Sequence, residues 1–296
     1  MRLIYALLLL ISCPAVSDPA HTGTVTVSTQ LGGTVEVSTR GVNTPLRPDS
    51  NTVVHKMLEH GANKQSLQRM PAIDVTAQNK KSQSVFLFGV IYSDLETLQF
   101  LNELDSSAVY LPDQHNRSPL LIGLKHKKPL AMIQFIYNLH PEAVSTPDNY
   151  GRLALHYAFR YTSDWEVIRF ILQMHPSAAF IPDNNGRSPL LIGLRNRRPL
   201  KMIKFIYDLH YKAVSTPDNH GNLALHYALK YTNDWEVIQF IFKMNPSAIF
   251  IRNNDGKTPI DIGKKHIKGF TTPQLWSSRP RKNSNRNRCQ KALSLR

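Results

Sequence analysis

Cationic side chains are the residues of this 296-residue chain whose types and spacing point most directly to a chemistry, the binding of anions. They gather in three clusters, at residues 125–128, 195–198 and 264–268, which occupy equivalent places in a repeating block. The cations that we assign to anion binding there are Lys125, Lys127, Lys128, Arg195, Arg197, Arg198, Lys264 and Lys265. Between the clusters lie the acidic pairs Asp94 and Glu96, Asp164 and Glu166, and Asp234 and Glu236. The expected anion-binding edge is therefore alternately basic and acidic.

The C-terminal segment adds a second concentration of positive charge. Residues 279–296 contain seven Lys or Arg residues and no acid, in a chain of formal net charge +15. The run RPRKNSNRNR resembles a nuclear-import or nucleic-acid-binding tract. Over a nuclear role for this run we favour two alternatives, a solvated tail or a contact with an anionic polysaccharide, lipid headgroup or acidic protein. Phe270 and Trp276 are the only aromatic residues of the tail over 270–296, which is a weak pattern for binding single-stranded nucleic acid. The cations assigned to anion binding here are Arg279, Arg281, Lys282, Arg286 and Arg288.

Catalytic patterns are missing from the sequence. It contains no HExxH, paired CxxC, Gly-rich phosphate loop or Ser/His/Asp arrangement, and its two cysteines are Cys13 and Cys289. His140 and His210 stand where a helix C-terminus would favour their positive form. We therefore expect a protein that is not an enzyme, with no catalytic residue, metal site, cofactor or small-molecule substrate.

The elements that carry these side chains are repeats. Residues 147–181 return almost unchanged at 217–251, and a related unit stands at 112–146 and again at 182–216. Gly151, Gly186, Gly221 and Gly256 follow one another at intervals of 35 residues. A fixed period of this size predicts a solenoid, in which each unit buries its apolar face by stacking on its neighbours.

Each unit can be divided into a turn and two helices. Residues 148–151 have turn chemistry, with Gly151 able to adopt a positive φ. A short helix follows over 153–158, and Trp165, Ile168 and Ile171 begin the apolar stripe of a second helix. We expect Ser163, Asn233 and Ser93 to open second helices by capping boxes with a Glu three residues later, and Pro129 and Pro199 to open the alternate ones. Trp165 and Trp235 are expected in the core.

These units resemble the ankyrin repeat. Residues 151–158 (GRLALHYA) are similar to the family's G-x-T-P-L-H-x-A, residues 118–121 and 188–191 keep its Pro, and residues 258–262 resemble a last repeat. The Thr-Pro is missing from the Leu-Ala-Leu-His units, and so is the usual Gly between the helices. The resemblance implies an all-α, ankyrin-type α-solenoid of stacked helix pairs, with structural roles for His156 and His226. The expected core residues are Leu155, Ile168, Ile171, Leu190, Ile203, Ile206, Leu225, Ile238 and Ile241.

The resemblance also implies a binding surface on the turns and the concave helices. Transferred residue by residue, it assigns partner binding to Tyr150, Arg152, Arg160, Asn185, Arg187, His220, Asn222 and Lys230. We therefore expect a monomeric interaction protein with a protein partner. The alternative is an electrostatic tether, or a binder of nucleic acid or another polyanion, that acts through the tail and the basic loops.

The remaining segments complete the expected organisation. Residues 1–17 have the charge, apolar run and small-residue site of a signal peptide, which predicts a secreted or secretory-pathway protein and would make Asn116 a glycosylation site. If residues 1–17 are not a cleaved signal, the nucleus or cytoplasm is the alternative. The apolar run is too short to span a bilayer. We expect disorder over 18–50, although its two Thr/Val runs could pair, a capping helix and linker over 51–78, five full repeats and a truncated sixth over 79–269, and a disordered basic tail over 270–296.

Overall fold

The computed structural model describes residues 24–28, 34–38, 50–70 and 72–275, with side chains from residue 53 onward. Its contacts divide the chain into two units, residues 1–49 and 50–296. In the first unit, β1 (Thr24–Ser28) pairs antiparallel with β2 (Thr34–Ser38), with Thr26 opposite Glu36. This hairpin is the pairing of the two Thr/Val runs that the sequence allowed, and the disorder expected elsewhere in 18–49 concerns residues outside the described ones. Alternating Thr and Val residues favour the extended backbone, and two such runs pair here without a larger sheet.

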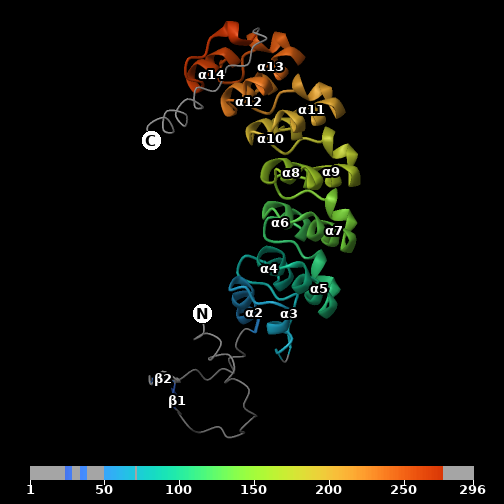
Figure 1. Cartoon of the computed structure of the whole chain (residues 1–296), viewed down its shortest axis with the longest axis vertical. Coiled ribbons are helices and arrows are strands. Elements are labelled where there is room, and N and C mark those ends of the chain that lie inside the picture. Colours follow the sequence, from blue (N-terminus) through green and yellow to red (C-terminus); the bar gives the residue numbers. More distant parts are fainter. Residues whose placement is uncertain (1–23, 29–33, 39–49, 71, 276–296) are drawn as a thin grey trace, which may run out of the picture. The chain divides into compact units, whose positions relative to one another are not determined.

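The second unit is a stack of helix pairs, each pair forming one layer (Figure 1). Two helices precede the repeats, α2 (Ser50–Glu59) and α3 (Lys64–Leu67). The first helices of the layers are α4 (Val85–Tyr92), α6 (Pro119–Lys125), α8 (Ala154–Tyr161), α10 (Pro189–Arg195), α12 (Ala224–Tyr231) and α14 (Pro259–His266). The second helices are α5 (Leu95–Leu104), α7 (Leu130–Leu139), α9 (Trp165–Met174), α11 (Leu200–Leu209) and α13 (Trp235–Met244). In the last layer, a short 3₁₀ helix, η6 (Thr272–Leu275), follows α14.

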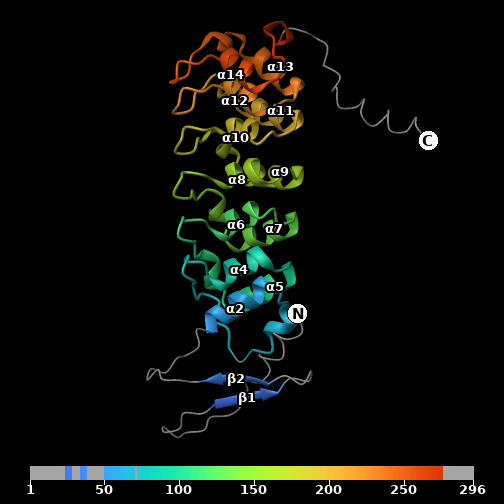
Figure 2. The same cartoon turned by 90° about the vertical axis from the view of Figure 1, so that its left-hand side faces the viewer.

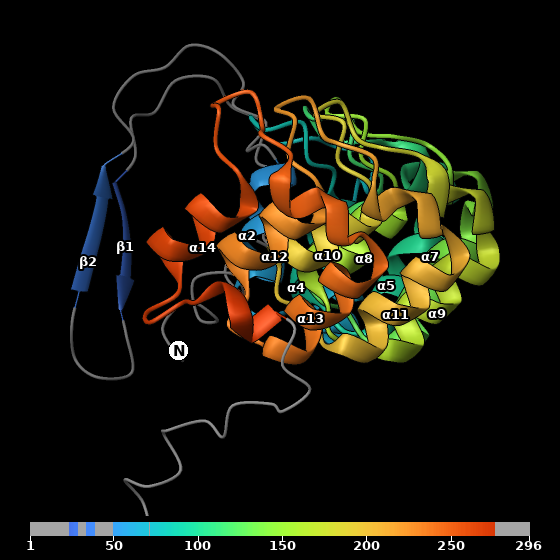
Figure 3. The same ribbon diagram turned by 90° about the horizontal axis from the view of Figure 1, so that it is seen from above.

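The layers stack in chain order. Each first helix from α4 to α12 contacts the first helix of the next layer (Figures 1 and 2). In the outer row of second helices, α7 contacts α9 and α11 contacts α13. Seen along the stack, the two sets of helices form separate rows and the turns form a third edge (Figure 3). The first helices lie on the concave side of this unit, next to the turns. None of the described helices is both long and apolar enough to cross a membrane.

The core is continuous through the layers and follows the predicted periodicity. All nine residues that the sequence analysis placed in it are at most 1% exposed, which confirms those assignments. Trp165 and Trp235 pack against this core but stay partly exposed, since each is the first residue of its helix. Burial in such a stack depends on neighbouring layers, because a single helix pair has too little apolar surface to enclose.

The second helices begin differently from the prediction. Asp94, Asp164 and Asp234 are the N-caps, and the carboxylate of each accepts hydrogen bonds from the first turn of its helix. The predicted capping boxes on Ser93, Ser163 and Asn233 are therefore wrong by one residue. An Asp at this position accepts hydrogen bonds from free N–H groups, and its negative charge is stabilised by the positive end of the helix dipole. Pro129 and Pro199 are N-caps of α7 and α11.

The turns are joined from layer to layer by backbone hydrogen bonds. The Asn184 N–H donates to the Tyr150 carbonyl at 3.0 Å, and the Asn219 N–H donates to the Asn185 carbonyl at 3.0 Å. Gly151 has a φ of +70°, which confirms its predicted role, and a Cβ there would lie 2.1 Å from the Asn184 side chain. The turns are therefore held in register along the stack.

Candidate functional site

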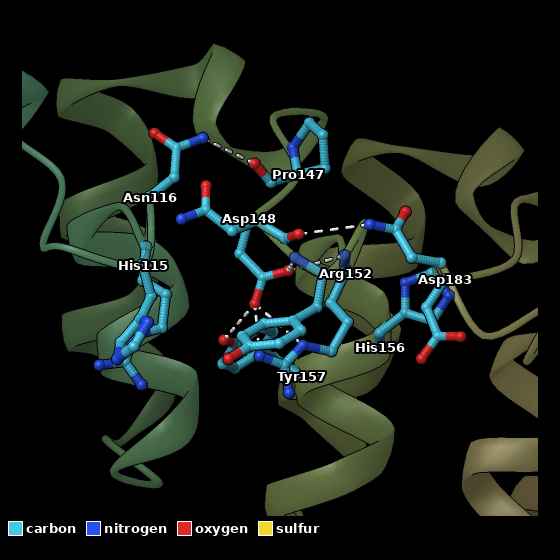
Figure 4. A network of polar contacts seen from close by, with 12 residues as sticks. His115, Asn116, Pro147, Asp148, Arg152, His156, Tyr157 and Asp183 are labelled. Atoms are coloured by element: carbon cyan, nitrogen blue, oxygen red, sulfur yellow. Dashed lines mark hydrogen bonds and ion pairs between the residues drawn. The ribbon is translucent and has the colours of Figure 1, made fainter.

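A carboxylate–guanidinium pair closes the turn that precedes several of the first helices. In the copy at residues 148–157, the Asp148 carboxylate accepts hydrogen bonds from Arg152 Nε at 2.9 Å, from Arg152 Nη2 at 2.6 Å and from the Tyr157 hydroxyl at 2.8 Å (Figure 4). It also accepts from the backbone N–H groups of Tyr150 and Arg152, both at 2.9 Å. Asp113 with Arg117 and Asp183 with Arg187 repeat this arrangement.

These contacts fix the charge state of the buried carboxylate. Burial opposes the ionisation of Asp148, but the hydrogen bonds from Arg152 and Tyr157 outweigh it and hold the pKa of Asp148 below its ordinary value. Arg152 and Arg187 thus stabilise the turns in which they stand, Arg187 also lines the groove described below, and their assignment to partner binding stays a prediction. Asn222 is also engaged, because its amide contacts Asp218 and its carbonyl oxygen accepts from Asn253 at 2.8 Å.

The other predicted partner-binding residues are accessible. Tyr150 and His220 are exposed at the tips of their turns, and Asn185 is partly exposed at the corresponding tip. Arg160 and Lys230 lie in the last turns of α8 and α12, on the concave side. The turn tips and the first helices therefore form one continuous face, which we call the concave face.

The concave face carries a cation from each of five successive layers. Lys125, Arg195 and Lys265, which the sequence analysis assigned to anion-binding loops, lie in the last turns of α6, α10 and α14. They alternate with Arg160 and Lys230, because all five residues occupy the same place in the 35-residue register. We call this row the concave column (Lys125, Arg160, Arg195, Lys230 and Lys265). The common register was visible in the sequence, but the two sets had been assigned to different functions.

Contacts between layers support this alignment. The guanidinium of Arg195 lies 5.6 Å from the centre of the Tyr231 ring, and Lys230 Nζ lies 5.2 Å from the same centre. Arg160 lies 5.3 Å from the ring of Tyr161, the equivalent tyrosine one block earlier. Cations over aromatic faces are attracted electrostatically, so these rings orient the charged groups.

A groove lies at the C-terminal end of the concave face. It has a volume of about 540 Å³ and lies between the turns and the first helices of the layers that contain α10, α12 and α14. Arg195, Lys230 and Lys265 of the concave column line it, together with His220 and Lys257. Lys257 and Tyr231 were not among the predicted site residues, although the register places them beside the turn and the column.

The basic loops that connect first and second helices have mainly internal contacts. Arg198 is buried, and its guanidinium donates to the Phe159 carbonyl at 2.8 Å, the Arg160 carbonyl at 2.8 Å and the Ser163 hydroxyl at 2.6 Å. Lys128 Nζ donates to the Ser93 carbonyl at 3.1 Å. The assignment of both residues to anion binding is therefore corrected, because unpaired helix carbonyls of the preceding layer already hold them.

The remaining loop cations are more accessible. Arg197 is exposed, but its Nε donates to the Tyr231 carbonyl at 2.6 Å. Lys127 and Lys264 are exposed, with Lys127 in a left-handed backbone conformation at a φ of +56°. Arg279, Arg281, Lys282, Arg286 and Arg288 lie outside the described residues, as do residues 1–17.

His156 and His226 have structural contacts. In each, Nδ1 accepts from the backbone N–H at the start of the first helix, from Leu153 at 3.0 Å and from Leu223 at 3.1 Å. His226 Nε2 lies 3.2 Å from the Lys257 carbonyl of the next layer. Burial lowers the pKa of His156 to about 4 and also lowers the pKa of His226, so both are neutral near pH 7.

Asn116 is exposed in its turn, with a φ of +58°. Its Nδ2 donates to the Pro147 carbonyl at 3.0 Å (Figure 4). The Ser118 hydroxyl of the same sequon accepts from the Leu121 N–H. A glycan at Asn116 would have to replace the contact with Pro147.

Comparisons with known proteins bear on the repeats and the fold. A family model described as ankyrin repeats (many copies) matches residues 209–262. Among solved structures, a chain in the complex of the Bd0816 predatory endopeptidase from Bdellovibrio bacteriovorus with the immunity protein Bd3460 is similar to this chain. That match has a TM-score of 0.55 at 16% identity and covers 69% of this chain and 100% of the other. The comparison with curated proteins finds no match. At this identity, the structural likeness concerns the fold alone.

Proposed function

This chain is an ankyrin-repeat protein, and we propose that it is a non-enzymatic interaction protein that binds a partner protein through its concave face. The observation that carries the proposal is the arrangement of that face. Accessible side chains from successive turns and first helices lie in one continuous row beside a groove of about 540 Å³. Ankyrin repeats are generally not enzymes, and the solved structure with a similar fold is itself a complex of two proteins.

The rigidity of the face supports this function. The turn tips are tied to one another by backbone hydrogen bonds between layers, and buried Asp–Arg pairs lock the turns that carry Tyr150 and Asn185. A surface that is already ordered loses little conformational entropy when a partner binds. Contact residues can therefore vary at the tips without disturbing the fold.

Site-specific photo-crosslinking tests the proposal in the full chain. A crosslinking residue replaces His220 on the concave face or, as the control, Gln173 on the second helix α9, which is also exposed. We expect the His220 position to crosslink a protein partner and excess unmodified protein to compete for it, whereas the Gln173 position gives no such product. Equal crosslinking from both positions, or crosslinking from Gln173 alone, would show that the concave face is not the binding surface.

A further inference from the structure

The concave column has few acidic side chains on its own face. The helices α6, α8, α10 and α12 contain no Asp or Glu. In α14, the carboxylate of Asp261 accepts from the Thr258 N–H at 2.9 Å and from the Thr258 hydroxyl at 2.8 Å. Among the described residues, no member of the column forms an ion pair. The column therefore presents uncompensated positive charge.

The acidic side chains of the array lie elsewhere. Asp113, Asp148, Asp183 and Asp218 are buried inside the turns. Acidic residues of the second helices, such as Glu96, Glu166, Asp208 and Glu236, belong to the other row of helices. On the concave face, the exposed acids that line the groove are Asp255 at the last turn tip and Asp261 in α14. The charge is thus segregated between the two rows.

The electrostatic environment of the column is itself positive at its N-terminal end. Burial lowers the pKa of Lys125, and the charges of Arg117, Arg152 and Arg160 lower it further, although Asp113 opposes them. A carboxylate that approached this position would relieve repulsion among the cations. At the other end, Arg195, Lys230 and Lys265 face the groove together.

We propose that the concave column binds an acidic segment of the partner protein in a polyproline II conformation, with a carboxylate at about every third residue. This inference rests on the proposed function and specifies its partner. Neighbouring helices in a stack lie about 8–10 Å apart. A polyproline II helix has three residues per turn and rises about 3.1 Å per residue, so carboxylates three residues apart lie on one face and recur at about the same interval. One acidic side chain can then meet one cation in each layer.

A nucleic acid fits this column less well. A nucleic-acid strand carries a charge about every 3.4 Å of helix axis, which is roughly three times denser than the column. Tyr161 and Tyr231, the rings beside the cations, are partly buried against the core and already contact Arg160 and Lys230. They are therefore not free platforms for stacking bases.

Fluorescence anisotropy with synthetic peptides tests the proposal on the full chain. The probe is a labelled peptide of about 15 residues with Glu at every third position, which spans the column in a polyproline II conformation. The test variant is R195Q/K230Q, and its matched control is K204Q/K243Q, whose exposed lysines lie on the second helices α11 and α13. Both variants lose the same formal charge, and the tail is unchanged in both.

We expect R195Q/K230Q to bind the spaced peptide about tenfold more weakly than the parent, because two exposed ion pairs are lost. The control should change by less than about twofold. A peptide of the same composition with its Glu residues in one block should bind the parent more weakly than the spaced peptide. Circular dichroism of both variants checks that the helices are intact.

Three outcomes would overturn the inference. Equal losses in the two double variants would mean that only net charge matters, and equal binding of spaced and blocked peptides would remove the role of register. Tighter binding of a single-stranded oligonucleotide than of the spaced peptide, lost in R195Q/K230Q, would assign the column to nucleic acid. If the peptide fails but His220 still crosslinks a partner, the proposed function stands and only the acidic segment is wrong.

Discussion

Arg152 and Arg160 show how two cations of the same type acquire different roles. Arg152 is four residues after an aspartate within one tight turn, and its guanidinium is held by that carboxylate. Arg160 has no acid in its helix, and its charged group lies over Tyr161. The spacing of Asp148 and Arg152 was readable in the sequence, whereas the burial of the pair was not. The buried ion pair gives Arg152 a structural role, whereas we expect Arg160 to be available to a partner.

The buried histidines make stability depend on pH. Because burial lowers the pKa of His156 from 6.5 to about 4, folding favours its neutral form. The stability that this provides is present above pH 6.5 and is lost as the pH falls toward 4. Between pH 7 and pH 5, His156 alone should cost about 2 kcal/mol of unfolding free energy. His226 shifts in the same direction and adds to the loss.

Urea denaturation at several pH values measures this effect, with H156N/H226N as the comparison. Asn offers an acceptor to the N–H groups of Leu153 and Leu223 but does not titrate, so the variant should lose much less stability between pH 7 and pH 5. The pKa values of Asp113 and Asp148 are lowered, so protonation of these carboxylates reduces the stability only below about pH 4. An identical pH dependence in parent and variant would show that the histidines are not responsible.

At the scale of elements, the alternation of two unit types has a physical cause in the contacts between layers. First helices of one type begin with a Ser N-cap and Pro, as in α10, whereas those of the other type begin with Leu and a His acceptor, as in α12. The loop after α10 then supplies Arg198 to the end of α8 and Arg197 to the end of α12. This basic loop thus completes the C-termini of the helices on both sides. The sequence alone shows the alternation but not these contacts.

The contribution of Arg198 can be measured against that of its neighbour. R198M removes three hydrogen bonds and leaves the Phe159 and Arg160 carbonyls without these partners, so we expect a loss of about 2–3 kcal/mol in unfolding free energy. R197M removes one exposed hydrogen bond and should cost less than about 1 kcal/mol. Urea unfolding of the two variants provides the comparison. Similar losses in both would contradict the buried, capping role of Arg198.

Much of the array follows from sequence because its period fixes which residues share an environment. The apolar positions, the turn glycines and the helix pairs are set by that register, and the core residues named from it are buried. The helix starts were misplaced by one residue, since Ser163 and Asp164 are both good N-caps and only backbone geometry separates them. The two anion-binding assignments at Lys128 and Arg198 failed for a related reason. Sequence spacing places them on a loop but does not show which layer they reach.

At the scale of the whole molecule, stacking by nearest neighbours predicts that layers can be removed. Deletion of residues 147–216 joins Thr146 to Pro217, which repeats the natural Thr216–Pro217 junction. We expect a shorter folded stack, because each layer depends on its immediate neighbours. Far-UV circular dichroism should show a helical spectrum with a cooperative thermal transition. Complete loss of the helical signal would contradict the solenoid account.

The same deletion removes Arg160 and Arg195 from the concave column and leaves Lys125, Lys230 and Lys265. The shortened array should therefore remain folded but bind the spaced acidic peptide more weakly than the full chain. Folding and recognition are in this way separable properties of the molecule. We expect the core to set the first and the exposed residues of the concave face to set the second.

A charge-reversal exchange on the full chain tests most directly whether the concave column binds an acidic segment. The measurement is the affinity of the parent, R195E/K230E and the outer control K204E/K243E for the spaced Glu peptide and for its Lys counterpart. We predict that the parent and the outer control prefer the Glu peptide and that R195E/K230E shifts its preference toward the Lys peptide by about tenfold or more. If R195E/K230E keeps the parent's preference, or if the outer control shifts by the same amount, the concave column is not a binding site for an acidic segment.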